Sequence, residues 1–383
     1  MKLAPDVTSM GYLLLSLLPL MAAPPADKLA DLVGTAVHKA AEPFMNADQT
    51  LAMSIGVFKD GRSFTYNFGV TEPGARRSPS MHTRYFIGSI TKTFTGILLA
   101  KAVREGKVSL DDDVRKHLDG DYPNLEFQGE PIRLWQLLNH TSGLPRDFPP
   151  RPDKPEPDYA RIAGQDNARM RAYTAEEFLR DLHVASLTRT PGVKFSYSNV
   201  AAQLLGLLLE KVYGKSYDAL IKEKIAGPLG MRDTKVALSP REIAEIPRAA
   251  SFSGTFLPAS STRLPAAGSL KSSTSDMLKY LAWNIAETDD AVRLAHRRTG
   301  NTDWGSSNFY VGLNWQILTG EGQRMIFQDG YLPGFHSMCL FCPERHIGIV
   351  VLSSEKVRAT PTRLSPLIDQ ILKRIDPGIM STP

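Results

Sequence analysis

The sequence predicts an α/β fold in which an antiparallel β-sheet is flanked by helices and divided by an all-helical insertion domain. Three observations give this prediction. Two alternating strand patterns follow the first helical pattern, a long helical and loop segment comes next, and three or more strands return before a final helix. Strands divided in this way by a run of helices are typical of an α/β sandwich with an inserted helical unit.

The first helix and the first two strands are expected near the N-terminus. Residues Asp27–Phe44 carry apolar side chains at helical spacing, which predicts an amphipathic helix. Residues Leu51–Val70 alternate between polar and apolar on both sides of an Asp-Gly pair, the usual signal of a β-hairpin. A further helix is expected to open at Ser89 and to end at Gly106.

The middle of the chain is mainly helix and loop. Helices are expected at Leu134–Asn139, Ala175–Leu187 and Val200–Val212. The Pro-rich, charged stretch at residues 146–159 can be neither helix nor central strand. It is either a flap over a cleft or an exposed loop.

The remaining strands are expected at Phe309–Leu318, Arg324–Gln328, His336–Phe341 and Ile347–Ser353, and the final helix at Thr362–Ile375. We therefore divide the chain into a signal peptide (1–26), a sheet domain (27–100 plus 249–376), a helical domain (101–248) and a tail (377–383).

The N-terminus resembles an export signal. A positive residue, Lys2, precedes the short apolar stretch Tyr12–Leu20, and small residues follow it. That stretch is too short to span a bilayer. We expect an exported, periplasmic or extracytoplasmic protein, with an uncleaved interfacial helix as the alternative.

Composition excludes some partners. The chain is 42% hydrophobic and 22% charged, as in ordinary globular proteins, with a net charge of +5. Its basic residues are interspersed with acidic ones, so nucleic-acid binding is not expected. The basic balance would suit peripheral contact with an anionic membrane or cell wall.

The chain contains two cysteines, Cys339 and Cys342. The spacing can indicate a redox or zinc site, but no second pair of cysteines is present. The two residues lie in a strand pattern, where positions i and i+3 face opposite sides. Two buried structural thiols are the better interpretation, and no metal is expected.

The first candidate for chemistry is Ser89-Ile90-Thr91-Lys92. On a helix, residues three apart share a face, so the Ser89 hydroxyl and the Lys92 amine can meet. A lysine whose pKa is lowered by burial can activate a serine, and the helix start offers N–H groups to a developing oxyanion. The alternative is a serine cap followed by a solvated lysine.

A second candidate, Tyr197-Ser198-Asn199, lies where a turn-rich segment meets an apolar helical run. Ammonium groups nearby would stabilise the Tyr197 phenolate, so that it could act as a general base. The Asn199 amide can orient both a lysine and a substrate amide. Taken alone, Tyr197 could be a packed aromatic and Asn199 a helix cap.

Together these motifs resemble the serine β-lactamase and penicillin-binding superfamily, in particular class C β-lactamases and related DD-peptidases and esterases. The stretches at residues 137–145, 228–234 and 267–277 are also similar to that family, and the resemblance spans roughly residues 51–372. It implies a β-lactamase/transpeptidase-like fold and catalysis by Ser89, Lys92 and Tyr197 without a cofactor. It also implies a D-alanyl peptide, a β-lactam or a small ester as substrate.

The family carries a third motif, K-T-G or H-x-G, on a strand beside the site. Here the corresponding residues are Gln328, Asp329 and Gly330, followed by Tyr331. The cation that would pair with a substrate carboxylate is therefore missing, whereas the Tyr331 N–H can still serve as an oxyanion donor. Together with Asn199, we expect Gln328, Gly330 and Tyr331 to bind substrate. The alternative is that residues 328–330 form an ordinary turn.

We therefore expect a serine hydrolase that acts through an acyl-enzyme, most simply on D-alanyl peptides of peptidoglycan as a DD-carboxypeptidase or endopeptidase. The alternatives are a class C-like β-lactamase, a carboxylesterase for small esters, and a non-catalytic protein that binds cell-wall fragments.

Overall fold

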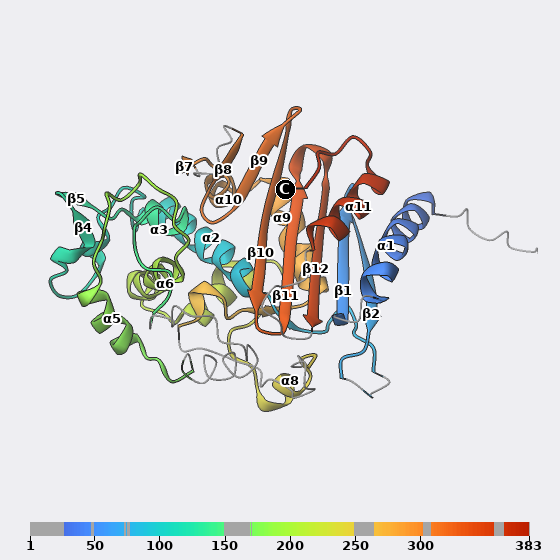
Figure 1. The fold of residues 1–383 in the computed structure, drawn as a ribbon, viewed down its shortest axis with the longest axis horizontal. Coiled ribbons are helices and arrows are strands. Elements are labelled where there is room, and N and C mark those ends of the chain that lie inside the picture. The colour runs from blue at the N-terminus through green and yellow to red at the C-terminus, as the bar shows by residue number, and fades with distance from the viewer. Residues whose placement is uncertain are drawn as a thin grey trace, which may run out of the picture.

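The computed structural model describes residues 27–46, 50–72, 74, 77–148, 169, 171–248, 264–301, 308–355 and 364–382. Its centre is an eight-stranded antiparallel sheet with the strand order β2-β1-β12-β11-β10-β9-β8-β7 (Figure 1). The strands are β1 (Thr50–Lys59), β2 (Arg62–Gly69), β7 (Gly300–Asn301), β8 (Phe309–Val311), β9 (Gln316–Gly320), β10 (Gln323–Leu332), β11 (Phe335–Cys342) and β12 (Ile347–Glu355). The predicted α/β class with an antiparallel sheet is confirmed.

Two pairs of short strands lie outside this sheet: β3 (Tyr85–Phe86) with β6 (Lys271–Ser272), and β4 (Glu126–Phe127) with β5 (Glu130–Pro131). The helices are α1 (Lys28–Asn46), α2 (Thr91–Arg104), α3 (Leu134–Leu138), α5 (Ala175–Val184), α6 (Asn199–Tyr213), α7 (Tyr217–Ile221), α8 (Pro240–Ala244), α9 (Thr274–Ala286), α10 (Asp290–Ala295) and α11 (Ser365–Ile375). No helix among the described residues is long and apolar enough to cross a membrane.

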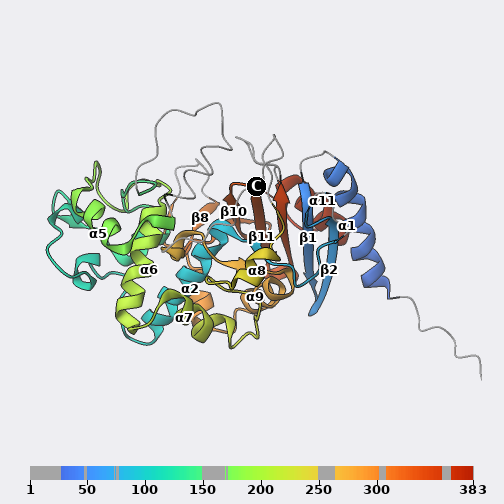
Figure 2. The same ribbon diagram turned by 90° about the horizontal axis from the view of Figure 1, so that it is seen from below.

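Each face of the sheet packs against its own helices. Helices α1 and α11 cover one face and enclose one apolar cluster. Helices α2 and α9 lie on the opposite face, as the turned view shows (Figure 2), and their cluster continues into α3 and α6. Because both faces are covered, the central strands β11 and β12 are buried throughout.

The N-terminal elements form as their sequence patterns predict. Helix α1 and the β1–β2 hairpin match the expected helix and hairpin within a few residues. The hairpin turn consists of Asp60 and Gly61, both with positive φ (48° and 82°), as a two-residue type I′ turn requires.

One predicted helix is shorter than expected. The pattern at Ala175–Leu187 predicted thirteen residues of helix, but α5 ends at Val184. The side-chain amide of Asn124 donates to the carbonyl oxygens of Leu182 and Ala185, at 2.7 and 2.8 Å. This distant side chain satisfies carbonyl groups at the end of the helix and so terminates it, which the local pattern could not show.

The prediction of one continuous strand at Phe309–Leu318 is wrong, because the structure has two strands there, β8 and β9, with a loop between them. In this loop Asn314 has a positive φ of 64°. The carbonyl oxygen of Leu313 lies against α2, where a Cβ on Gly96 would come within 2.3 Å of it. Packing against α2 therefore interrupts a sequence that alternates like a single strand.

The later strands extend slightly beyond their predicted ends. Residues 328–330 lie inside β10, with Gln328 opposite Cys339 on β11, so the alternative of an ordinary turn is wrong. Both cysteines are buried and unoxidised, in opposite apolar clusters of the sheet, which confirms the interpretation as two structural thiols.

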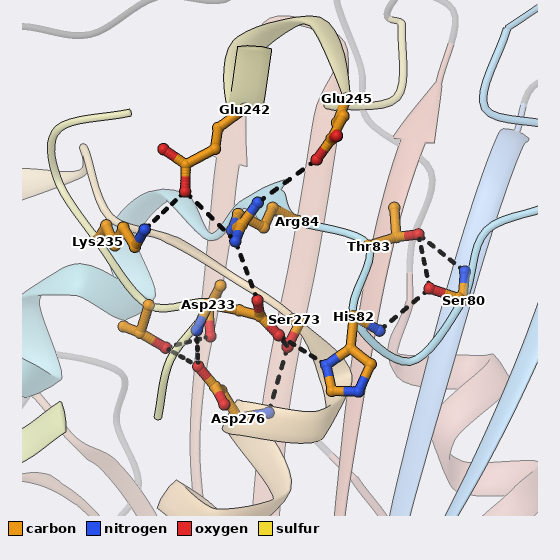
Figure 3. A network of polar contacts seen from close by, with 12 residues as sticks. Ser80, His82, Thr83, Arg84, Asp233, Lys235, Glu242, Glu245, Ser273 and Asp276 are labelled. Atoms are coloured by element: carbon orange, nitrogen blue, oxygen red, sulfur yellow. Dashed lines mark hydrogen bonds and ion pairs between the residues drawn. The ribbon is translucent and has the colours of Figure 1, made fainter. Parts of the chain in front are cut away.

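A polar network joins the segment leading into β3 to α9 and to the chain before α8 (Figure 3). The carboxylate of Asp233 accepts from Arg84 at 3.1 Å and from Ser273 at 3.0 Å, and lies 2.9 Å from His82 Nδ1. Asp276, on α9, accepts from the Asp233 backbone N–H at 2.6 Å. Because Asp233 and Asp276 are nearly buried, these bonds contribute more than exposed ion pairs would. The network fixes the strand that leads to Ser89.

Three predicted segments lie wholly or partly outside the described residues: the export segment at 1–26, most of the Pro-rich stretch after Phe148, and the first residues of the last predicted helix. The division into sheet and helical domains at residues 100 and 249 stays a prediction.

We expect Gly96→Ala to destabilise the protein by about 1–3 kcal/mol, because the added methyl group would overlap the Leu313 carbonyl. Gly34→Ala is the matched control. Gly34 lies inside α1, where a Cβ would make only ordinary contacts, so the same change there should stabilise by about 0.5–1 kcal/mol. Chemical denaturation midpoints measure both effects, and equal shifts would contradict the proposed packing at Gly96.

Candidate active site

Ser89 lies in a short 3₁₀ turn, η1 (Gly88–Ile90), between β3 and α2. The helix proper begins two residues later, so Ser89 precedes the first turn of α2 rather than opening it. Gly88 has a φ of 50°, and a Cβ there would come within 2.8 Å of the backbone of Gly330 and Tyr331. The turn that carries Ser89 is thus packed directly against strand β10.

Lys92 meets the Ser89 hydroxyl as the i, i+3 spacing predicts. Its Nζ donates to Ser89 Oγ at 2.9 Å and to the carbonyl oxygen of Ala267 at 2.6 Å, and the residue is fully buried. Burial lowers the pKa of Lys92 to about 7, although the Asp147 carboxylate opposes that shift. The alternative of a solvated lysine is wrong. At neutral pH a large fraction of this amine is uncharged and can accept a proton.

Tyr197 reaches the same hydroxyl from the other side. Its phenol oxygen lies 2.6 Å from Ser89 Oγ, and Lys92 Nζ lies 4.9 Å from the centre of its ring. Burial raises the pKa of Tyr197, and the hydrogen bond from Ser89 opposes this only in part. Burial therefore disfavours the expected phenolate in the resting site. A protonated phenol at Tyr197 suits relay of a proton rather than initial deprotonation of Ser89.

Asn199 is the first residue of α6, and the cap of that helix is its neighbour Ser198, whose Oγ accepts from the Ala201 N–H at 3.0 Å. The Asn199 amide nitrogen donates to the Asp147 carboxylate at 2.7 Å, and its backbone N–H donates to the carbonyl oxygen of Arg146 at 2.7 Å. The alternative of a helix cap is thus wrong for Asn199, which instead holds the Arg146–Asp147 segment beside the site.

Sequence reasoning missed Arg146 and Asp147 as parts of the site. The Arg146 guanidinium lies 5.3 Å from the centre of the Tyr197 ring, and its Nε lies 3.6 Å from Asp147. The charges of both residues act on Lys92 and Tyr197. The only signal in the sequence was their position directly after a stretch similar to the family.

His140 was also missed as a neighbour of the site. Its ring centre is 4.3 Å from that of Tyr197, and its Nδ1 accepts from the Ser198 N–H at 3.3 Å. Its carbonyl oxygen accepts from the Ser196 N–H at 2.7 Å, although His140 itself has a left-handed φ of 62°. Burial, together with the Lys92 charge, lowers the pKa of His140 to about 3, so the ring is neutral. It packs behind Tyr197 without adding charge.

Strand β10 contributes the backbone beside Ser89. A Cβ on Gly330 would come within 2.0 Å of the carbonyl oxygen of Ile87, so only glycine allows this approach. Ser337 Oγ, on β11, lies 2.8 Å from the Ile87 carbonyl oxygen and 3.2 Å from that of Gly330. The backbone nitrogen of Tyr331 therefore lies close to the turn that bears Ser89, where two N–H groups can face one oxyanion.

Gln328 is not brought to the Ser89 hydroxyl. Its side chain is 3% exposed, donates to the Asn314 carbonyl oxygen at 3.0 Å and accepts from Gln316 Nε2 at 2.9 Å. These bonds hold the loop between β8 and β9. The predicted role of Gln328 in binding substrate stays a prediction, and Gly330 and Tyr331 lie beside the turn that carries Ser89.

The arrangement is that of a serine hydrolase. A hydroxyl faces both a buried amine and a phenol, and a backbone strand lies beside it. A family model described as Beta-lactamase matches residues 37–373, and the chain belongs to this family. No group of residues in the described part of the chain is arranged to hold a metal ion.

The chain is similar in sequence to two curated proteins and in structure to a third protein. D-alanyl-D-alanine-carboxypeptidase/endopeptidase AmpH from Escherichia coli (strain K12) is 27% identical over 354 residues, which cover 88% of this chain and 86% of that protein. Protein flp from Staphylococcus aureus (strain MRSA252) is 28% identical over 330 residues, or 83% of this chain, which spans only 62% of that protein's length. The crystal structure of a β-lactamase/D-alanine carboxypeptidase from Yersinia pestis in complex with citrate has a TM-score of 0.76 at 25% identity, covering 90% of this chain and 99% of that one.

The pKa of Lys92 predicts the pH dependence of acylation. Because the protonated amine cannot accept the Ser89 proton, the second-order acylation rate should rise with pH and level off above about 7. In Asp147→Asn the midpoint should move to lower pH, since the lost carboxylate had favoured the ammonium form. Stopped-flow acylation between pH 5 and 9 measures this. A flat profile, or a midpoint displaced upward in Asp147→Asn, would contradict Lys92 as the base.

Lys92→Ala and Tyr197→Phe should each slow acylation by about 10²- to 10⁴-fold, the usual contribution of a positioned acid or base. The double variant should be little slower than the slower single variant, because the two groups share one hydroxyl and act as a unit. Burst-phase kinetics give all four rates. Losses that multiply in full would show that the residues act independently.

Proposed function

We propose that the protein hydrolyses D-alanyl peptides of peptidoglycan through an acyl-enzyme on Ser89, as a DD-carboxypeptidase or endopeptidase. The observation that carries the proposal is the convergence of Lys92 Nζ, at 2.9 Å, and the Tyr197 phenol, at 2.6 Å, on the Ser89 oxygen. Serine is a weak nucleophile unless a base takes its proton, and this geometry supplies one.

In the acylation step the neutral Lys92 amine takes the Ser89 proton as the oxygen attacks the substrate carbonyl. The oxyanion that forms is held by the N–H groups of Ser89 and Tyr331. The Tyr197 phenol donates its proton to the departing amine or alcohol and recovers one from the Lys92 ammonium. Water then attacks the acyl-enzyme, with the same groups moving protons in reverse. No metal or organic cofactor is needed in these steps.

Similarity to two relatives supports the proposed substrate class. AmpH and the Yersinia protein are both described as D-alanyl or D-alanine carboxypeptidases, and the alignments cover most of both proteins. A second candidate, hydrolysis of small esters, is favoured by Gln328, because the resemblance assigns this buried neutral amide to the position at which the family has a cation. For the same reason we place efficient β-lactamase activity below both.

Such substrates lie outside the cytoplasm, and we propose that the protein is exported. Support comes from the N-terminal sequence, in which Lys2, a short apolar stretch and small residues resemble a signal peptide. A net charge of +5 is compatible with peripheral contact with an anionic membrane or wall.

The central test is intact-mass analysis after incubation with a labelled penicillin, joined to assays of D-alanine release and aryl-ester hydrolysis. The wild type should acquire one adduct, and Ser89→Ala should acquire none and lose turnover by several orders of magnitude. Ser63→Ala, an exposed serine on β2, is the matched control and should behave as wild type.

The outcomes separate the candidates. Release of D-alanine with a slowly decaying adduct supports the peptidase, whereas turnover of the aryl ester alone supports the esterase. An adduct that persists in Ser89→Ala, or more than a few per cent of residual turnover, would refute the mechanism. Absence of both adduct and turnover in the wild type would favour a non-catalytic wall-binding protein.

A further inference from the structure

Two cations lie near the ring of Tyr197, and they differ in their access to a substrate. Lys92 Nζ, 4.9 Å from the ring centre, is buried and donates to Ser89 Oγ and to the carbonyl oxygen of Ala267. The carbon of the Arg146 guanidinium lies 5.3 Å from the same centre, and the side chain of Arg146 is 69% exposed. Of the two cations, Arg146 is therefore the one that an arriving substrate can contact.

Arg146 is held beside Tyr197 by hydrogen bonds between their two chain segments. The Asn199 N–H donates to the carbonyl oxygen of Arg146 at 2.7 Å, and Ser198 Oγ donates to that of Pro145 at 2.6 Å. Ser198 and Asn199 directly follow Tyr197 in the chain, so these bonds fix the backbone of Arg146 relative to the segment that carries the phenol. The guanidinium and the phenol are therefore positioned together.

The Arg146 guanidinium retains donors for a further anion. Its Nε lies 3.6 Å from the Asp147 carboxylate, which also accepts from the Asn199 amide at 2.7 Å. Among the residues that the structure describes, neither terminal nitrogen of Arg146 has a hydrogen-bond partner. A planar guanidinium can bind a carboxylate through two parallel N–H bonds. The exposed end of Arg146 can therefore bind a carboxylate that belongs to a ligand.

The proposed reaction brings such a carboxylate to this place. In a peptide that ends in free D-alanine, the nitrogen that Tyr197 protonates is joined through one carbon to the terminal carboxylate. Two bonds of about 1.5 Å and one hydrogen bond of about 3 Å place the carboxylate carbon within about 6 Å of the phenol oxygen. Residues 328–332 of β10, beside the turn of Ser89, include no cation. Arg146 is thus the exposed cation within reach of that carboxylate.

We propose that Arg146 is a specificity-determining residue whose guanidinium binds the substrate carboxylate next to the scissile bond, on the leaving-group side. This inference rests on the proposed function and deepens it, because it selects peptides that end in a free D-alanine carboxylate over capped ones. Part of the selection is electrostatic, so it should weaken as the ionic strength rises.

The first test compares diacetyl-L-lysyl-D-alanyl-D-alanine with its C-terminal amide, which has the same shape and no carboxylate. In the wild type kcat/KM should be higher for the acid. In Arg146→Gln the acid-to-amide ratio should fall by about tenfold, the lower end for a charge-assisted hydrogen bond because Arg146 is exposed. Arg146→Lys keeps the charge but loses the planar fork, so its ratio should lie between the other two.

The ratio separates binding of the carboxylate from a general effect on catalysis. The Arg146 charge also lowers the pKa of Lys92, so its removal changes the acylation of both substrates alike and leaves their ratio unaffected. Arg374→Gln is the matched control. It removes an exposed arginine from α11, which covers the opposite face of the sheet from α2, and its ratio should equal that of the wild type.

A second test needs no peptide turnover. Benzylpenicillin carries its carboxylate one carbon from the departing nitrogen, as D-alanine does, and its methyl ester has no charge there. Intact mass against time gives the acylation rate of Ser89 by each compound. In Arg146→Gln the acid-to-ester ratio of these rates should again fall by about tenfold.

The outcomes distinguish the two proposals. Wild-type ratios in Arg146→Gln in both tests, with the uncharged compounds still reacting, would overturn the inference alone. If the wild type cleaves neither peptide but its acylation by benzylpenicillin depends on Arg146, the proposed peptidase function is wrong and the assignment of Arg146 is supported.

Discussion

The site depends on the contact between two backbones, that of the turn carrying Ser89 and that of strand β10. Gly88 and Gly330 face each other so closely that a Cβ on either would overlap the opposite backbone. Ser337 lies within hydrogen-bond distance of the carbonyl oxygens of both segments. This contact sets where α2 begins, and through α2 it sets where Lys92 lies. The same backbone contact therefore positions the sheet, helix α2 and the candidate oxyanion donors relative to one another.

The second constraint is electrostatic. Burial of Lys92 disfavours its charged form, the Asp147 and Asp329 carboxylates oppose that effect, and the Arg146 guanidinium adds to it. His140, packed against Tyr197, is neutral and so adds no second buried cation next to Lys92. The site thus holds its amine near the point at which it can both accept and donate a proton at neutral pH.

Much of the fold and the centre of the site could be predicted from local pattern. The spacing of Ser89 and Lys92 fixes their shared helical face, and the Asp-Gly pair fixes the first hairpin. The split of the predicted strand at Phe309–Leu318 could not be seen, because it is caused by packing of Leu313 on α2. The early end of α5 depends in the same way on Asn124, about sixty residues away.

The protonation states of the site residues could not be predicted from the sequence either. Nearby ammonium groups suggested a phenolate at Tyr197, but burial has the larger effect and is a property of the folded chain alone. The internal partners of Gln328 and the positions of Arg146 and Asp147 likewise depend on contacts between distant segments.

The placement of the two thiols has a practical consequence. Cys339 faces the cluster under α2 and α9, whereas Cys342 faces the cluster under α1 and α11. Side chains on opposite faces of one strand cannot be joined by a disulfide, so the folded chain keeps these two thiols apart. Each then becomes accessible to an alkylating reagent only when its own layer opens. The two alkylation rates thus report separately on the opening of the two layers that enclose the sheet.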